Sequence, residues 1–304
     1  MTTVKLHNDL LTIEISTHGA ELQSIRNNLT GQEYLWHGDP AFWGRRSPVL
    51  FPIVGAVWEG RFRMDGRVYE MGQHGFARDR DFSLIEGSPE DEAWFSLDAD
   101  EASLLIYPRR FRLEIGYRLT GERIDVMWRV VNRDTQTMSF QIGAHPAFML
   151  PGFSAADDVH GYLMFDGGPD FVRQLIEARG CVGTETAPVI LDDQTMLPIA
   201  ADTFARDAII LAGGRTRRVS LLDKERRPLL TLLSFRHSGG GVVVASGQEC
   251  SVCLHRAVVG QGRFRRLRRR LRRPRLCQHP CRRSDIRDLL SDCHRQHLIT
   301  IYYL

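Results

Sequence analysis

Long apolar runs, cysteine and glycine-rich phosphate loops are scarce in this sequence, and each absence excludes a class of protein. No run of 18 apolar residues occurs, so no membrane-spanning helix is expected. The start of the chain lacks the apolar stretch of a secretory signal, which makes the cytoplasm the expected location. Neither common phosphate-binding glycine motif is present. With 43% hydrophobic and 25% charged residues, the 304-residue chain has the composition of a globular protein.

Basic residues and cysteines are unevenly distributed, and they divide the chain near residue 236. Residues 237–304 contain 14 Arg, no Lys and four acidic residues, a net charge of +10. Residues 1–236 carry a net charge of −7 and one cysteine, Cys181, whereas the other five cysteines follow. We therefore expect a globular domain at residues 1–236 and an Arg/Cys-rich tail at residues 237–304.

Apolar residues in the first 236 positions alternate with polar ones more often than they recur at helical spacing. Leu11, Ile13 and Ile15 alternate with polar neighbours, which predicts a strand with one apolar face. The same alternation on both sides of a Thr-Gly-Glu turn predicts a hairpin over residues 112–130. Shorter apolar runs predict further strands at residues 140–142, 208–211, 219–222 and 229–232. No convincing 12-residue amphipathic helix occurs, and the pattern predicts an all-β fold, a large antiparallel β-sandwich.

Three segments place basic groups where a strand pattern does not require them. They are Arg45–Gly55 (RRSPVLFPIVG), Gln73–Asp79 (QHGFARD) and Gly143–Phe148 (GAHPAF). A pair of arginines is often only a solvated face, and a single histidine is more often structural than catalytic. In the third segment, however, proline follows His145 and stops strand pairing, so this histidine is expected in a loop, a common position for active groups.

With two earlier segments, Gly19–Leu22 (GAEL) and Glu33–Trp36 (EYLW), these motifs resemble the bacterial branch of the aldose 1-epimerase family, also called galactose mutarotases. The segments follow the family order over residues 4–235. The resemblance implies a large antiparallel β-sandwich that binds a sugar in an open cleft. It also implies an isomerase that interconverts the α and β anomers of a hexose or hexose phosphate. No metal, cofactor, membrane or nucleic-acid partner is expected, and the sequence does not indicate an oligomeric state.

Anomer exchange needs an acid for the ring oxygen and a base for the anomeric hydroxyl. The resemblance implies that His145 is the general acid and that His74, the second catalytic residue, hydrogen-bonds the sugar. It assigns substrate binding to three further side chains, Arg46, Arg78 and Asp207. Asp207 is about as well explained by capping of a turn. Trp43 and Trp58 are candidates for stacking on a sugar face, or for ordinary packing.

The family base has no counterpart in this chain. In the family it is a glutamate in a Glu-Pro-Trp segment near the C-terminus, whereas this sequence has Leu254–Val259 (LHRAVV) and then an arginine-rich run. Loss of one acid–base group predicts a rate lower by roughly two to four orders of magnitude. A non-catalytic carbohydrate-binding protein on the same scaffold is therefore the alternative function.

The tail has three interpretations. Its cysteines and histidines could form a zinc module, and its arginines at residues 265–275 could bind nucleic-acid phosphates. Few turn-forming residues separate the possible zinc ligands, which argues against the module. The third interpretation is translation one nucleotide out of frame, with the slip between residues 230 and 237. Shifted by one base, residues 256–267 are compatible with EPWWARADFDG, which restores the missing Glu-Pro-Trp segment. An out-of-frame tail predicts irregular or disordered structure, exposed strand edges and low stability.

Overall fold

Strands dominate the computed structural model of the chain. It describes residues 2–166, 170–177, 181–206, 208–211, 216, 218–234, 241–247, 251–260 and 297–303. In this part, α1 (Glu101–Ile106) is the one α-helix, and the 3₁₀ helices η1 (Trp58–Gly60) and η2 (Ala77–Asp79) lie in loops. None of the described helices is long and apolar enough to cross a bilayer.

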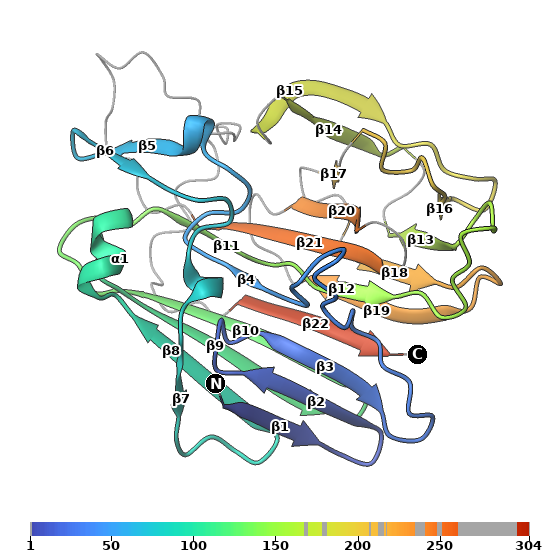
Figure 1. Cartoon of the computed structure of the whole chain (residues 1–304), viewed down its shortest axis with the longest axis horizontal. Coiled ribbons are helices and arrows are strands. Elements are labelled where there is room, and N and C mark those ends of the chain that lie inside the picture. The colour runs from blue at the N-terminus through green and yellow to red at the C-terminus, as the bar shows by residue number, and fades with distance from the viewer. Residues whose placement is uncertain are drawn as a thin grey trace.

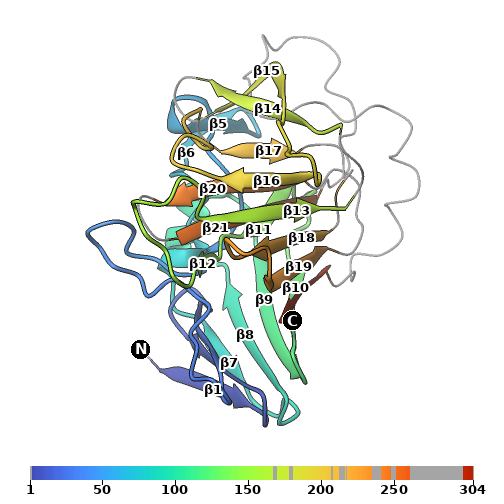
Figure 2. The same cartoon turned by 90° about the vertical axis from the view of Figure 1, so that its right-hand side faces the viewer.

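Two large antiparallel sheets form the body of the molecule (Figures 1 and 2). The nine-stranded sheet has the order β16 (Met196–Ile199), β13 (Gly161–Phe165), β18 (Arg218–Leu222), β19 (Pro228–Ser234), β22 (His297–Tyr303), β10 (Arg123–Asn132), β9 (Phe111–Thr120), β8 (Glu92–Asp98) and β7 (Ser83–Ile85). The eight-stranded sheet has the order β15 (Cys181–Pro188), β14 (Val172–Glu177), β17 (Ile209–Leu211), β20 (Gly241–Gly247), β21 (Ser251–Gly260), β11 (Phe140–Ala144) and β4 (Val49–Leu50), and β12 (Ala147–Met149) also pairs with β21. Two small sheets complete the fold: β1 (Thr3–His7), β2 (Leu11–Ser16) and β3 (Leu22–Asn27) form one, and β5 (Arg61–Met64) and β6 (Arg67–Glu70) form the other. The predicted all-β antiparallel architecture is confirmed.

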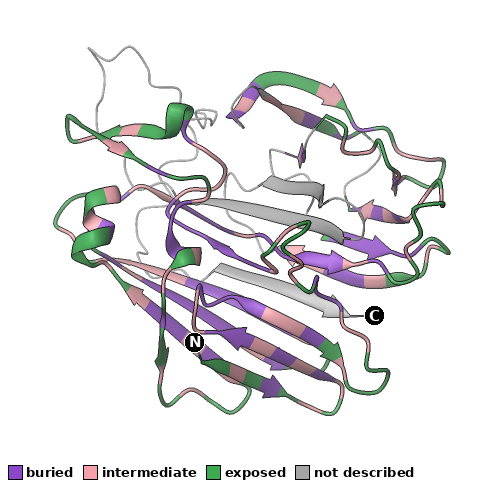
Figure 3. Cartoon of the chain, in the orientation of Figure 1, coloured by how far each residue is buried: buried purple, intermediate pink, exposed green. Residues whose placement is uncertain are grey.

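The hairpin predicted over residues 112–130 is formed by β9 and β10. The two strands pair from Thr120 and Arg123 at the turn to Phe111 and Asn132 at the open end. The alternating apolar side chains are buried along both strands, including the large ring of Trp128. Figure 3 shows this burial as purple bands on neighbouring strands. Alternation thus identified the hairpin because every second side chain faces the core.

The predicted strands in the 140–142, 208–211, 219–222 and 229–232 segments are present as β11, β17, β18 and β19. The helix α1 is only six residues long, too short to show an amphipathic repeat. It begins because the Asp100 side chain accepts a hydrogen bond from the backbone N–H of Ser103, and the Ser103 hydroxyl accepts one from the N–H of Asp100. Such a capping box marks the start of a helix even where periodicity cannot.

The tail differs in part from the irregular segment that was expected. The structure places three strands in it: β20 pairs with β17 and β21, and β22 lies between β19 and β10. Their segments are rich in β-branched residues, and the neighbouring strands offer open edges with which such segments can pair. Residues 261–296, which include most of the arginine-rich run, lie outside the described residues. The domain boundary at residue 236 and the out-of-frame interpretation stay predictions.

Candidate active site

The loop that contains His74 is bound tightly to the segment at residues 51–55. His74 adopts a left-handed backbone conformation, with φ of 65°. Its N–H donates to the carbonyl of Gly55 at 2.7 Å, and the N–H of Gly55 donates to Nδ1 of the imidazole at 3.0 Å. The N–H groups of Phe76 and Ala77 both donate to the carbonyl of Phe51. The ring of His74 therefore has a fixed orientation.

Gly75 makes this close approach possible. Its φ is 73°, and a Cβ placed on it would lie 2.1 Å from the carbonyl oxygen of Phe51. We expect Gly75→Ala to lower the free energy of unfolding by about 2–4 kcal/mol, measured by urea denaturation. Gly66→Ala is the control, because Gly66 also has a positive φ but a Cβ added there would meet no atom within 4 Å. Equal losses in the two variants would show that the contact with Phe51 is unimportant.

The electrostatic environment keeps His74 neutral. Burial lowers the pKa of His74 from 6.5 to about 4, and the positive charges of Arg78 and Arg45 act in the same direction. Because Nδ1 accepts a hydrogen bond from Gly55, the neutral ring holds its proton on Nε2. His74 can therefore donate this N–H to an oxygen of a bound molecule at neutral pH.

This lowered pKa predicts a pH dependence of stability. Between about pH 6.5 and 4 the unfolded chain binds a proton at His74 and the folded chain does not, so acid favours unfolding. In His74→Asn this contribution is absent, since asparagine can still accept from Gly55 and tolerates a positive φ but does not titrate. We expect the drop in unfolding free energy from pH 7 to pH 4 to be about 1–3 kcal/mol smaller in the variant. Parallel pH profiles of the two proteins, from chemical denaturation, would contradict the lowered pKa.

His145 lies between β11 and β12, as its position before a proline predicted. Its backbone N–H donates to the carbonyl of Pro48 at 3.1 Å, and the side chain is buried. The rings of His145 and His74 are perpendicular, with centroids 5.7 Å apart. The indole of Trp43 stacks on His145 with a centroid distance of 4.7 Å and an angle of 27°. The structure thus brings together two histidines that are 71 positions apart in the sequence.

The arginines of the site differ in their surroundings. Arg78 donates through Nη2 to the carbonyl of Gln73 at 2.8 Å, and burial together with Arg45 lowers its pKa. Arg45 forms an ion pair with Asp79 at 2.6 Å. These two cations lie close enough to His74 to act on its titration.

Arg46 has a different orientation. Its Nη1 donates to the backbone carbonyl of Gln23 on β3 at 2.6 Å, and its side chain lies against Gly38. The structure therefore turns Arg46 toward β3, although its backbone carbonyl accepts from Ala147, two residues after His145. Asp207, the fifth predicted site residue, lies outside the described residues.

Two buried side chains that sequence reasoning missed hold residues 46–54, a segment that is hydrogen-bonded to the backbone of His145. The carboxylate of Glu21 accepts from the N–H groups of Arg46 and Ser47 at 2.9 and 2.7 Å. The Oε1 of Gln141 accepts from the N–H of Val54 at 2.8 Å. Glu21 belongs to the GAEL motif, but its role could not be predicted because its partners are distant in sequence. Both groups satisfy backbone donors that burial would otherwise leave unpaired.

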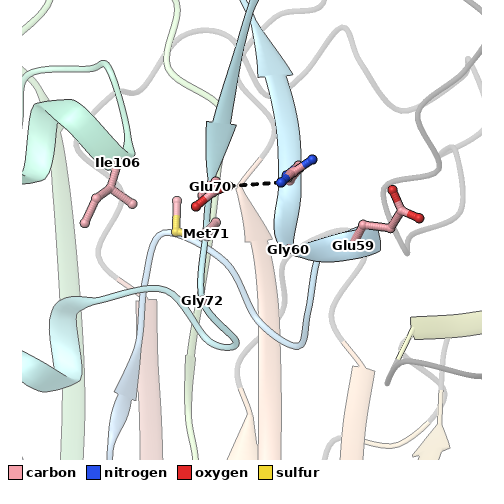
Figure 4. A pocket seen from close by; sticks show the side chains of 7 residues that line it. Glu59, Gly60, Glu70, Met71, Gly72 and Ile106 are labelled. Carbon is pink, nitrogen blue, oxygen red and sulfur yellow. Dashed lines mark ion pairs between the residues drawn. The ribbon is translucent and has the colours of Figure 1, made fainter.

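A hollow beside the β5–β6 hairpin is lined by residues that include neither histidine. It is lined by Glu59, Gly60, Arg61, Glu70, Met71, Gly72 and Ile106 (Figure 4). Arg61 and Glu70 form an ion pair across the hairpin at 3.4 Å. None of the predicted site residues lines this hollow, so it does not define the candidate active site.

The described residues contain no group of three or more histidine, cysteine or acidic side chains arranged to hold a metal ion. The tail residues considered as zinc ligands are not among the side chains that the structure describes.

Comparison with known proteins identifies the family. Residues 2–166 match the sequence profile of aldose 1-epimerase. Protein LacX (chromosomal) of Lactococcus lactis is 32% identical over 237 residues, which cover 73% of this chain and 76% of LacX. A galactose mutarotase-like protein from Lactobacillus casei superposes with a TM-score of 0.78 at 26% identity, covering 84% of this chain and 87% of its own. A galactose mutarotase related enzyme from Lactobacillus acidophilus has the same fold, with a TM-score of 0.77 at 24% identity over 100% of this chain and 97% of its own. The profile spans more than half of the sequence, and with the similarity to LacX it shows that this chain belongs to the aldose 1-epimerase family.

Proposed function

We propose that the chain binds an aldose and interconverts its α and β anomers by acid–base ring opening. The observation that supports this most is the perpendicular contact between His74 and His145, with ring centroids 5.7 Å apart. The ring of His74 is a neutral hydrogen-bond donor of fixed tautomer. We assign the proton transfer to His145, because an imidazole nitrogen can give up a proton and take it back. A family member with this pair has the groups needed to orient a sugar and to protonate it.

In the proposed reaction His145 gives a proton to the ring oxygen while the bond from that oxygen to the anomeric carbon breaks. The anomeric hydroxyl gives its proton to a water molecule at the same time, and an open-chain aldehyde with a free C5 hydroxyl forms. Rotation about the bond next to the aldehyde exposes its other face. The C5 hydroxyl then attacks the aldehyde carbon and returns its proton to His145, while the carbonyl oxygen takes a proton back from water, so no net proton or electron is consumed. His74 donates its Nε2–H to a sugar oxygen throughout.

Arg78 and Arg45 are the cationic groups that act on the titration of His74, and we infer that they contact the oxygens of the sugar. A guanidinium offers a planar fork of donors that suits two hydroxyl groups or a phosphate. The substrate is thus a hexose or a hexose phosphate. Comparing the affinities for galactose and galactose 6-phosphate distinguishes the two.

One observation favours a second function, non-catalytic sugar binding. The strand register places Arg256 of β21 directly opposite Ala144, the residue before His145. Arginine has no proton acceptor, so this position cannot supply the base that the reaction requires. A protein with the acid and the sugar-binding groups but no base would bind a sugar without turning it over efficiently.

Polarimetry separates the two functions. Freshly dissolved α-D-galactose is followed with and without the full-length protein, and binding of the same sugar is measured by calorimetry. Exchange faster than the spontaneous rate supports the enzyme, and binding without faster exchange favours the alternative. Absence of both, for the free and the phosphorylated sugar, would contradict the proposed function.

A further inference from the structure

The indole of Trp43 stacks on one face of the imidazole of His145. The two rings are 4.7 Å apart at an angle of 27°, a stacked arrangement, while the ring of His74 stands perpendicular to His145. Aromatic pairs at such distances attract each other beyond the burial of their area. The imidazole is therefore in contact with one ring on its face and with a second ring at a right angle.

The segment that presents Trp43, here called the aromatic loop (residues 36–43), is itself firmly held. The backbone N–H of Trp43 donates to the carbonyl of Asp39 at 2.8 Å. The indole N–H of Trp36 donates to the carbonyl of Trp43, also at 2.8 Å. Because both bonds fix the backbone at residue 43, the position of its side chain does not depend on the contact with His145 alone.

The aromatic loop is anchored to the same segment that follows His145. Trp36 is buried and packs with Ala147 of β12 in a small cluster that also includes Trp43 and Met149. The backbone N–H of Trp36 donates to the carbonyl of Ala147 at 2.9 Å. The loop and the histidine therefore share one rigid support, two residues beyond the imidazole.

We propose that Trp43 is a positioning residue that holds the imidazole of His145 in the orientation needed for proton transfer. This inference rests on the proposed function, in which His145 is the acid. It replaces the sequence-based expectation that Trp43 stacks on the sugar, since the indole already stacks on the histidine. A ring held on its face cannot rotate away from the bound sugar, and misplacement of a catalytic group by about 1 Å can cost about 10²-fold in rate.

The first test is spectroscopic and does not need activity. The ring-proton resonances of His145 are identified by their absence in His145→Gln. In Trp43→Ala these resonances are expected to move because the ring current of the indole is lost, and in Trp43→Phe they are expected to move less. The control is Trp94→Phe, since Trp94 packs over Gly116 of β9 and contacts Arg129. Unmoved resonances in Trp43→Ala would overturn the proposal.

The second test separates positioning from sugar binding. In Trp43→Ala we expect kcat for α-D-galactose to fall by about 10²-fold with KM within about twofold of the wild-type value, and Trp43→Phe to recover most of the rate. A raised KM with an unchanged kcat would instead identify Trp43 as a sugar platform and overturn the proposal. If the wild-type protein catalyses no anomer exchange, the proposed enzymatic function is wrong. The role of Trp43 is then judged from the His145 resonances and the galactose affinity. A moved His145 resonance with unchanged galactose affinity would then still support the contact, and weakened affinity would overturn it.

Discussion

Replacing His145 by glutamine is expected to lower the rate of anomer exchange by roughly two to four orders of magnitude. Glutamine has a similar length and can form hydrogen bonds, but it cannot deliver a proton to the ring oxygen. An imidazole nitrogen can do so because it both gives and takes up a proton. The measurement is polarimetry of α-D-galactose at saturating sugar, with sugar affinity determined separately and expected to change only a few-fold.

The matched control for this variant is His160→Gln. The ring of His160 packs on Phe153, with centroids 4.5 Å apart, and its backbone pairs with Ile199. It has no described contact with His74 or His145, so the rate of exchange should remain that of the wild type. If His145→Gln also retained the wild-type rate, His145 would not be the acid and the assignment of the site would be wrong.

Replacing Arg256 by glutamate is expected to raise the rate of anomer exchange by roughly two to four orders of magnitude. Strand β21 pairs with β11 through Arg256 and Ala144, and with β12 through Cys253 and Ala147. Strand β21 therefore pairs with the residue before His145 and with the second residue after it. Shifted by one base, the codons that begin at Arg256 are compatible with Glu-Pro-Trp, so a glutamate at position 256 would restore the family base where the out-of-frame interpretation places it.

Arg256→Gln is the control, because it removes the positive charge without adding a base. If the glutamate variant were no faster than the glutamine variant, position 256 would not be the place of the base.

The same position tests the out-of-frame interpretation at the level of the gene. When the codons for Arg256 and Ala257 are read one base later, they must give a glutamate codon. If they do not, the out-of-frame interpretation is wrong.

Much of the fold could be predicted because strands show their packing in local sequence. The alternation around Gly121 predicted the hairpin of β9 and β10 and its apolar face, but the sequence did not show that Glu114, Asp125 and Met127 on the other face are buried as well. Strands in the tail were not predicted, because its arginine-rich composition suggested irregular structure. The pairing of β22 with β10 and β19 also joins strands that are far apart in the sequence.

The candidate site was predictable in its residue types but not in its arrangement. His145 could be placed at the end of a strand because proline follows it. The stacking of Trp43 on that ring could not be predicted, because 102 positions separate the two residues and an indole packs equally well on many surfaces. The buried Glu21 was missed for a related reason, as its partners are backbone N–H groups of a distant segment.

The sequence alone therefore determined the all-β class, the main hairpin and the histidines that deserved consideration. It could do so because periodicity and proline act over a few neighbouring residues. Only the tertiary structure decided that His74 and His145 meet, that Nδ1 of His74 accepts a hydrogen bond from Gly55, and that Trp43 stacks on His145. These features arise from contacts between remote segments, such as the hydrogen bond from Val54 to Gln141 across 87 positions, and such contacts leave no local pattern.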